Sequence, residues 1–261
     1  MSFDRRKFIK FSGLTVLGLA GRTVGDTLSK TDTTEVAETG SLQQPLTAHR
    51  WAMVVDMKKC RQQEGCRDCI TACHREHNVP HFDNPKDEIK WIWKSSFKHA
   101  FHEQEHEYLP DDLKNSHVLL LCNHCDNPPC TKVCPTQATW KRESDGVVMM
   151  DWHRCIGCRY CMVACPYGSR SFNWRDPRSF IEEIKPEYPT RTRGVVEKCT
   201  FCDERLARGL PPACVEACKE KALVFGDLED PESEVRQLLQ GQMALQRKPA
   251  LGTIPEVYYL V

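Results

Sequence analysis

The sequence predicts an α+β fold in which short strands lead into cysteine-rich loops and short helices. First, short apolar runs at residues 51–55, 118–121 and 147–150 each precede a group of cysteines. Second, every group ends in C-x3-C, which puts the last cysteine about one helical turn beyond its predecessor. Third, residues 138–140 and 147–150 flank an Asp145-Gly146 turn, which is typical of a β-hairpin. A strand, a cysteine loop and a short helix therefore form the expected repeating unit.

The overall composition is ordinary except for cysteine. The chain has 261 residues, of which 40% are hydrophobic and 28% charged, as in soluble globular proteins of one or two domains. Lys plus Arg equals Asp plus Glu at 36 each, so no net positive field favours nucleic acid or an anionic membrane surface. Cysteine is the outlier with 16 residues.

Residues 1–21 are expected to form an export signal of the twin-arginine type. The pair Arg5-Arg6 precedes the apolar run 8–20, which is too short to span about 30 Å of hydrocarbon. A basic amphipathic N-terminus is the alternative. Twin-arginine export carries folded proteins, so this signal suits a protein that folds before it reaches the periplasmic face of the membrane. Residues 22–47, rich in Thr, Asp, Glu, Ser and Gly, are expected to be a flexible linker.

The cysteines fall into four groups of four along the chain. Group one is Cys60, Cys66, Cys69 and Cys73; group two is Cys122, Cys125, Cys130 and Cys134; group three is Cys155, Cys158, Cys161 and Cys165; group four is Cys199, Cys202, Cys214 and Cys218. Pro135 and Pro166 follow the last cysteines of groups two and three, where the proline ring turns the chain out of a helix. Gly157, inside group three, is expected to let the backbone approach the sulfurs closely.

Group three gives the most specific chemical signal. It matches the run C-x2-C-x2-C-x3-C-P at every position. In bacterial two-cluster ferredoxins the first three cysteines of this run hold one [4Fe–4S] cluster and the fourth holds a second. The other three groups are variants in which one gap is longer. The sequence therefore predicts that all sixteen cysteines bind iron, in four [4Fe–4S] clusters.

Two other uses of cysteine fit this spacing less well. Structural zinc uses paired C-x2-C knuckles, but it does not call for a third cysteine two residues on and a fourth three further. A disulfide framework would suit an exported protein, yet it is mainly the device of domains too small to build a core. Closely spaced cysteine triplets are also poor partners for one another in disulfides, because the bond restricts the Cα separation.

Two segments lie outside the cysteine repeat. The insertion between groups one and two carries aromatic residues that are expected to cover a cluster or to pack on the core: Trp91, Trp93, Phe97, Phe101 and Tyr108. Residues 231–261 are expected to form a C-terminal helix, running through Gln246, and then a strand or packed tail at 257–261.

The histidines offer the main alternative to a pure electron carrier. His99, His102 and His106 are spaced for neighbouring turns of one helix and could belong to an enzyme site. A charged, solvated helix face is the favoured interpretation. Four further histidines lie beside or within the cysteine groups and are expected to shield or tune clusters rather than bind another metal: His74, His77, His124 and His153.

With these motifs in view, the chain resembles the four-cluster ferredoxin-type iron–sulfur subunits of membrane reductases such as polysulfide, nitrite and dimethyl-sulfoxide reductase complexes. The resemblance covers about residues 49–230. It rests on the stretches Cys122-Asn-His-Cys125-Asp-Asn-Pro-Pro-Cys130, Cys199-Thr-Phe-Cys202 and Pro211-Pro-Ala-Cys214-Val-Glu-Ala-Cys218. The export signal, the widened Cys60 to Cys66 gap and the tail at 252–259 look closest to DsrO-type subunits of sulfite-reduction-associated DsrMKJOP complexes.

The resemblance implies two ferredoxin-like modules within residues 48–230, each with two clusters and exchanged fourth ligands. Module A would pair groups one and four, and module B would pair groups two and three. The implied ligand sets are Cys60, Cys66, Cys69 with Cys218; Cys199, Cys202, Cys214 with Cys73; Cys122, Cys125, Cys130 with Cys165; and Cys155, Cys158, Cys161 with Cys134. The five-residue gap after Cys60 departs from the pattern, so the residues around Gly65 must loop out or approach a partner.

The resemblance also implies a function and partners. The chain would carry electrons, without substrate chemistry of its own, between a quinone-interacting integral membrane subunit and another redox subunit, such as a multihaem cytochrome c, in respiratory sulfur metabolism. It would lie at the periplasmic face of the cytoplasmic membrane, held there by partners or by an uncleaved signal. The alternatives are the iron–sulfur subunit of a molybdopterin-type reductase and a structural zinc-binding adaptor.

Overall fold

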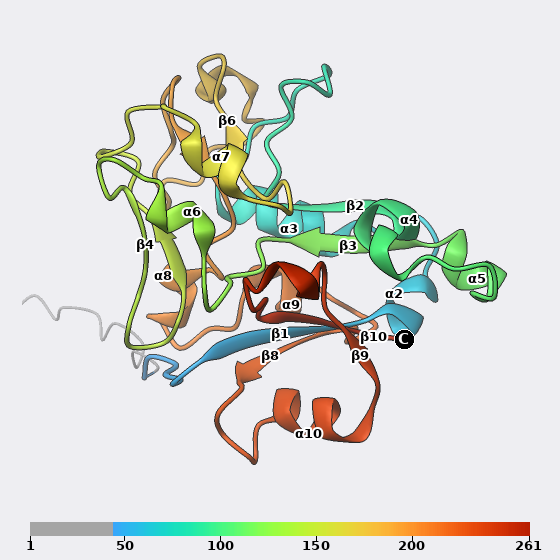
Figure 1. Ribbon diagram of the computed structural model, residues 1–261. Helices are drawn as coiled ribbons and strands as arrows, with labels where there is room; N and C mark the ends of the chain where they lie inside the picture. The colour runs from blue at the N-terminus through green and yellow to red at the C-terminus, as the bar shows by residue number, and fades with distance from the viewer. Residues whose placement is uncertain (1–43) are drawn as a thin grey trace, which may run out of the picture. The chain divides into compact units, whose positions relative to one another are not determined.

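A four-stranded mixed sheet joins strands from both ends of the described chain (Figure 1). The computed structural model describes residues 44–261, so the expected signal and the linker up to residue 43 lie outside the described residues. Strand β1 (Trp51–Asp56) pairs antiparallel with β8 (Leu223–Asp227) and parallel with β10 (Val257–Leu260), and β10 pairs antiparallel with β9 (Ala244–Leu245). Residues 51–55 are all buried, which explains why this strand is an unbroken apolar run rather than an alternating one.

Helix α10 (Glu234–Gly241) covers one face of this sheet by packing on β8 and β1. Val235 is fully buried there against Ala52, Val54 and Leu260. The prediction that this helix runs to Gln246 is wrong. It ends at Gly241, because glycine is a poor helix former and because residues 244–245 pair with β10 as strand β9.

Within the described residues 44–261, three two-stranded antiparallel ribbons accompany this sheet. They are β2 (Ile92–Ser96) with β3 (His117–Leu121), β4 (Thr139–Lys141) with β5 (Val148–Met150), and β6 (Ser171–Phe172) with β7 (Val196–Glu197). The strands predicted before groups one, two and three are therefore confirmed, and so is the hairpin around Asp145-Gly146. Group four also follows a strand, the very short β7.

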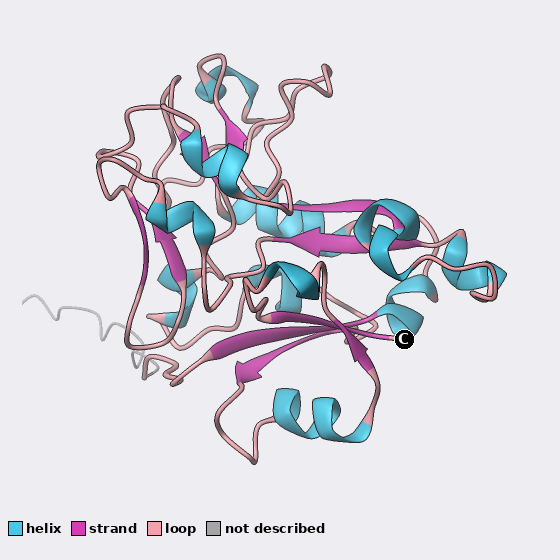
Figure 2. Ribbon diagram, viewed as in Figure 1, coloured by secondary structure: helices cyan, strands magenta, loops and turns pink. Residues whose placement is uncertain are grey.

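Each cysteine group runs into or through a short helix, as the C-x3-C spacing predicts. The helices that carry cysteines or adjoin them are α2 (Met57–Arg61), α3 (Asp68–Glu76), α6 (Pro129–Lys132), α7 (Tyr160–Ala164), α8 (Asp203–Leu206) and α9 (Ala213–Glu216). Two 3-10 turns, η2 (Pro177–Phe180) and η3 (Pro249–Leu251), lie in the connecting loops. Around these short elements much of the chain is loop (Figure 2). The mixed helix and strand content agrees with the predicted α+β class.

The insertion between groups one and two contributes mainly to the core. It contains β2, α4 (Phe97–Ala100), η1 (His102–Gln104) and α5 (Asp111–Lys114). Trp91, Phe97 and Phe101 are buried, whereas Tyr108 is 83% exposed. The prediction of a covering role is therefore wrong for Tyr108.

The three insertion histidines do not share one helix. Helix α4 ends at Ala100, since Phe101 leaves the helical conformation to pack its ring against Phe97. His99 therefore lies on α4, His102 on η1 and His106 in the following loop, and all three are exposed. The idea of a shared helix face is thus corrected. Within residues 44–261, no helix combines the length and apolar character needed to cross a bilayer.

Candidate metal centre

Two helix pairs bring cysteine groups from distant parts of the sequence together. Helix α3 packs against α9, which places group one beside group four, and α6 packs against α7, which places group two beside group three. Cys69 and Cys73 lie on α3 and Cys214 on α9. Such pairing is what the exchange of fourth ligands requires, because each set takes one sulfur from another group.

The first cysteine set surrounds a small cavity. The cavity is lined by Cys60, Cys66, Cys69 and Cys218, with Leu119 and Leu223 among its apolar walls. Burial raises the pKa of Cys69 to about 12, and the neighbouring sulfurs of Cys60, Cys218 and Cys66 add to the rise. Lys94 reaches the edge of this cavity and donates to the backbone carbonyl of Cys66 at 2.5 Å.

A second cavity holds the next set. Its walls include Cys122, Cys125, Cys130 and Cys165, together with Arg170. Burial raises the pKa of Cys125 to about 12, and the sulfurs of Cys122, Cys130 and Cys165 add to this effect. All four cysteines line this one cavity, so their side chains face a common space.

The third set is the most deeply buried. Burial raises the pKa of Cys73 well above its ordinary value, and the sulfurs of Cys202, Cys199 and Cys214 raise it further. Cys73 comes from group one and the other three from group four. The structure therefore brings these four together in the combination that the resemblance implies.

The fourth set lies nearer the surface. Cys161 is buried in an apolar cluster against which Cys134 and Cys155 pack, while Cys158 is half-buried on the same loop as Cys155. Cys134 accepts a hydrogen bond from the amide of Ala138 at 3.2 Å. Burial opposes ionisation of Cys134, but hydrogen bonds from the backbone and from Thr136 outweigh it and lower the pKa of this thiol.

These sites suit an iron–sulfur cluster chemically. All sixteen cysteines are free rather than paired in disulfides. A buried thiolate makes it harder for the neighbouring thiols to ionise. A bound metal ion overcomes this effect, because its positive charge stabilises the deprotonated sulfurs. Backbone amides also point at sulfurs in three further places, from Phe201 to Cys199, Ala213 to Cys202 and Ala222 to Cys218, at 3.3–3.4 Å. Amide donors of this kind stabilise cluster sulfurs. The iron-binding role of each cysteine stays a prediction.

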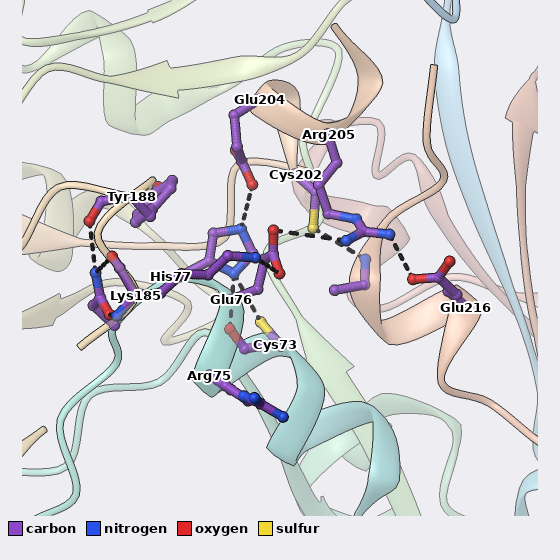
Figure 3. A network of polar contacts seen from close by, with 12 residues as sticks. Cys73, Arg75, Glu76, His77, Lys185, Tyr188, Cys202, Glu204, Arg205 and Glu216 are labelled. Carbon is purple, nitrogen blue, oxygen red and sulfur yellow. Dashed lines mark hydrogen bonds and ion pairs between the residues drawn. The ribbon is translucent and has the colours of Figure 1, made fainter. Parts of the chain in front are cut away.

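His77 links the third set to a network of charged residues (Figure 3). Its Nδ1 lies 2.8 Å from the carbonyl oxygen and 3.7 Å from the Sγ of Cys73, and its Nε2 lies 3.0 Å from a carboxylate oxygen of Glu204. The donor atoms of His77, Cys202 and Glu204 all lie within 4.8 Å of one another. Because Cys202 and Cys73 belong to one sulfur set, this geometry suits the predicted tuning role of His77 better than a separate metal site.

Among the other histidines near the cysteines, His124 is the best defined. It is buried, its ring stacks on Phe201 at 3.6 Å, and its Nδ1 accepts a hydrogen bond from the amide of Val148. The structure shows a further close approach at Gly157. A Cβ there would lie 2.3 Å from the carbonyl oxygen of Gly194, so the close approach is to backbone.

Sequence reasoning missed several buried charges around the sulfurs. Arg170 and Lys198 are both buried, and Lys198 donates from Nζ to the carbonyl oxygen of Cys199 at 2.6 Å. Arg191 and Glu197 form a buried ion pair in the segment before group four. Charged residues normally indicate exposed surface, so the sequence carried no signal for the burial of any of the four.

Comparisons with known proteins agree with this chemistry. The family of 4Fe-4S dicluster domains matches residues 116–180 and 184–228. The chain is 41% identical to the Hdr-like menaquinol oxidoreductase iron-sulfur subunit 1 of Archaeoglobus fulgidus, over 98% of this chain and 97% of that protein. It is 37% identical to the menaquinone reductase iron-sulfur cluster-binding subunit of Nitratidesulfovibrio vulgaris, over 81% and 88%. It is 34% identical to the protein NrfC of Escherichia coli K12, over 99% and 95%.

Proposed function

We propose, on the premise that this chain belongs to the family of ferredoxin-type iron–sulfur electron-transfer subunits of reductase and oxidoreductase complexes, that it carries electrons through four [4Fe–4S] clusters. The family's members are electron-transfer subunits rather than catalytic subunits, and this chain is one of them. The observation that carries the proposal of four clusters is the grouping of sixteen free cysteines into sets that draw on two groups each.

The residues of the chain supply what such a function needs. Bound [4Fe–4S] clusters provide one-electron oxidation and reduction. The cysteine sets would hold them, the backbone amides that face the sulfurs would stabilise their negative charge, and the apolar walls would limit contact with water. The cavity walls offer little polar surface for a substrate, which suits an electron carrier.

A contact between the two proposed modules supports a continuous route. The pKa of Cys199 is raised to about 12 by burial and by the nearby sulfur of Cys122. Cys122 belongs to group two and Cys199 to group four, so one sulfur from each module lies at the junction. Phe201, stacked on His124, joins the same two groups. This junction suits electron passage between modules A and B.

The proposed partners follow from the relatives. Two of them are named as parts of menaquinol and menaquinone enzymes, which supports a quinone-interacting membrane subunit as one partner. We propose that the second partner is a further redox subunit, such as a multihaem cytochrome c. The two partners and this chain would form a respiratory sulfur-metabolism complex of the DsrO-containing type. The twin-arginine-type signal supports a place at the periplasmic face of the membrane.

A second candidate is the iron–sulfur subunit of a terminal reductase. Relatives with 37–39% identity are named as subunits of dimethyl sulfoxide, arsenate and tetrathionate reductases. The composition of the complex separates the candidates: a molybdopterin-containing subunit that co-purifies would favour the reductase, and a cytochrome c with a membrane subunit would favour the quinone-linked complex.

The direct test is anaerobic purification followed by iron and sulfide analysis. Four clusters of this type predict about sixteen iron atoms and about sixteen sulfides per chain. Redox titration monitored by electron paramagnetic resonance should then resolve the separate clusters. Colourless protein that contains zinc and no inorganic sulfide would instead identify the structural zinc-binding adaptor.

A further inference from the structure

Arg170 is a buried cation whose neighbours are sulfur atoms. Its side chain is only 5% exposed. Its Nη2 donates to the Sγ of Cys130 at 3.0 Å and to the hydroxyl of Thr139 at 2.9 Å, and its Nη1 lies 3.8 Å from the sulfur of Met150. Within residues 44–261, no carboxylate forms an ion pair with this guanidinium, whereas the buried Arg191 and Arg205 both have carboxylate partners.

The guanidinium faces two different cysteine sets. Cys130, which accepts a hydrogen bond from Arg170, lies in one buried cluster with Cys161 and Met150. Cys130 and Cys161 belong to different proposed clusters, so one cation lies between the two.

The fold holds this side chain in place from both sides. Arg170 directly precedes β6, and the neighbouring Ser169 donates its hydroxyl to the carbonyl of Leu121 at 3.2 Å. Thr139, which accepts a hydrogen bond from Arg170, donates to the carbonyl of Met149 across the β4–β5 ribbon at 2.7 Å. The position of the charge is therefore set by two strands and a loop rather than by the cysteines alone.

A buried cation without a carboxylate needs another source of negative charge. Here that source is sulfur. An iron–sulfur cluster held by four thiolates is anionic, and it becomes more negative by one charge when it accepts an electron. A fixed positive charge at hydrogen-bond distance makes that added charge more favourable, and the effect is strong because the surroundings are dry.

We propose that Arg170 is a shared electrostatic positioning residue that keeps the reduction potentials of both module B clusters higher than they would otherwise be. The inference rests on the proposed function, because it needs clusters at the group-two and group-three sets. It goes further by assigning one residue to two clusters and by predicting that module B accepts electrons more readily because of it.

The experiment is a redox titration of the anaerobically purified holoprotein, followed by electron paramagnetic resonance. In Arg170→Gln two of the four midpoint potentials should shift to more negative values, while the two others stay at their wild-type values. Arg170→Lys keeps the charge but loses the planar fork that reaches Cys130 and Thr139 together. Its two potentials should therefore lie between those of the wild type and those of the Gln variant.

Arg159→Gln is the matched control. Arg159 lies in the group-three loop, but it is exposed and stacks on the rings of Phe172 and Trp174. Water and salt screen an exposed charge, so its loss should shift the potentials less than the loss of Arg170. Equal shifts in the two variants would overturn the proposal, because the buried position of Arg170 would then have no effect on the reduction potentials.

The other outcomes are also decisive. Iron and sulfide analysis of each preparation separates the inference from the proposed function, because wild-type protein without clusters defeats the function itself. Wild-type potentials in an Arg170→Gln variant with full iron content would overturn the inference, as would a shift in one cluster only. Should both Arg170 variants lose the module B clusters, Arg170 would be a folding residue and the proposal would be wrong. If only Arg170→Gln loses the module B clusters and Arg170→Lys shows the shift in potential, the result would support the proposal.

Discussion

Arg191 and Glu197 form an ion pair of 2.6 Å in which neither side chain is exposed to solvent. The carboxylate of Glu197 also accepts hydrogen bonds from Trp91 Nε1 at 2.9 Å and from Asn173 Nδ2 at 2.6 Å. The guanidinium of Arg191 donates to the carbonyl of Asn78 at 2.9 Å. One buried pair thus ties the insertion, the segment after group three and the strand before group four to one another.

Glu197→Ala should lower the free energy of unfolding by about 3–5 kcal/mol, because Arg191 would remain buried without a counter-charge. Anaerobic denaturant titration followed by tryptophan fluorescence would measure the loss. Glu183→Ala is the control, since its ion pair with Arg75 is 3.7 Å long and both side chains are more than 70% exposed. That variant should unfold at the wild-type midpoint. Equal midpoints for the two variants would contradict the prediction.

Gly157→Ala should disturb group three, because the new methyl group would lie 2.3 Å from the carbonyl oxygen of Gly194. Gly168→Ala is matched to it, since Gly168 has a similar positive φ of 65° but no atom within 4 Å of the added carbon. Both variants carry the strain of a left-handed residue, of about 1–2 kcal/mol. Only Gly157→Ala should also lower the iron content per chain. Equal iron contents would show that the close approach to Gly194 is unimportant.

The exchange of fourth ligands predicts which cysteine variants share a phenotype. Cys165→Ala should perturb the same paramagnetic signal as Cys122→Ala, although Cys165 stands in group three. Cys161→Ser should perturb a different signal and slow quinol-linked electron transfer through the complex. If Cys165→Ala and Cys161→Ser instead alter one common signal, each group binds its own cluster and the exchange is wrong.

Tyr258 should make the fold sensitive to alkali. Burial, with the charge of Glu256, raises the pKa of its phenol to about 12, above the unfolded value of about 10. A raised pKa means that the folded state favours the neutral phenol, so this contribution is complete below about pH 10 and is lost as the pH rises toward 12. Denaturant midpoints at pH 8 and pH 11 should therefore differ less in Tyr258→Phe than in the wild type. An identical pH dependence would refute this.

The local secondary structure was predictable from the sequence. Strands, cysteine loops and short helices have short-range signals, such as the apolar run 118–121 before Cys122 and the Asp145-Gly146 turn. The chemistry of the site followed from cysteine spacing for the same reason. The count of four clusters and their ligand sets stay predictions.

Features that depend on distant parts of the chain were not predictable. The spacing of His99, His102 and His106 suggested one helix, but the packing of Phe97 and Phe101 in the core ended that helix early. Arg170 stands in a polar stretch that reads as an exposed loop. Its burial arises only when α6, α7 and the β4–β5 ribbon close around it, so no pattern near Arg170 could reveal it.

The parallel pairing of β1 with β10 has a consequence for how the protein is made. The ribosome releases β1 well before β10, because all four cysteine groups are synthesised between the two strands. Until then one edge of β1 lacks its neighbour and is open to wrong association. The loop of group one follows β1 directly, so its final shape depends on a late event. Nascent fragments that stop short of Val257 would therefore leave this edge of β1 without its partner strand.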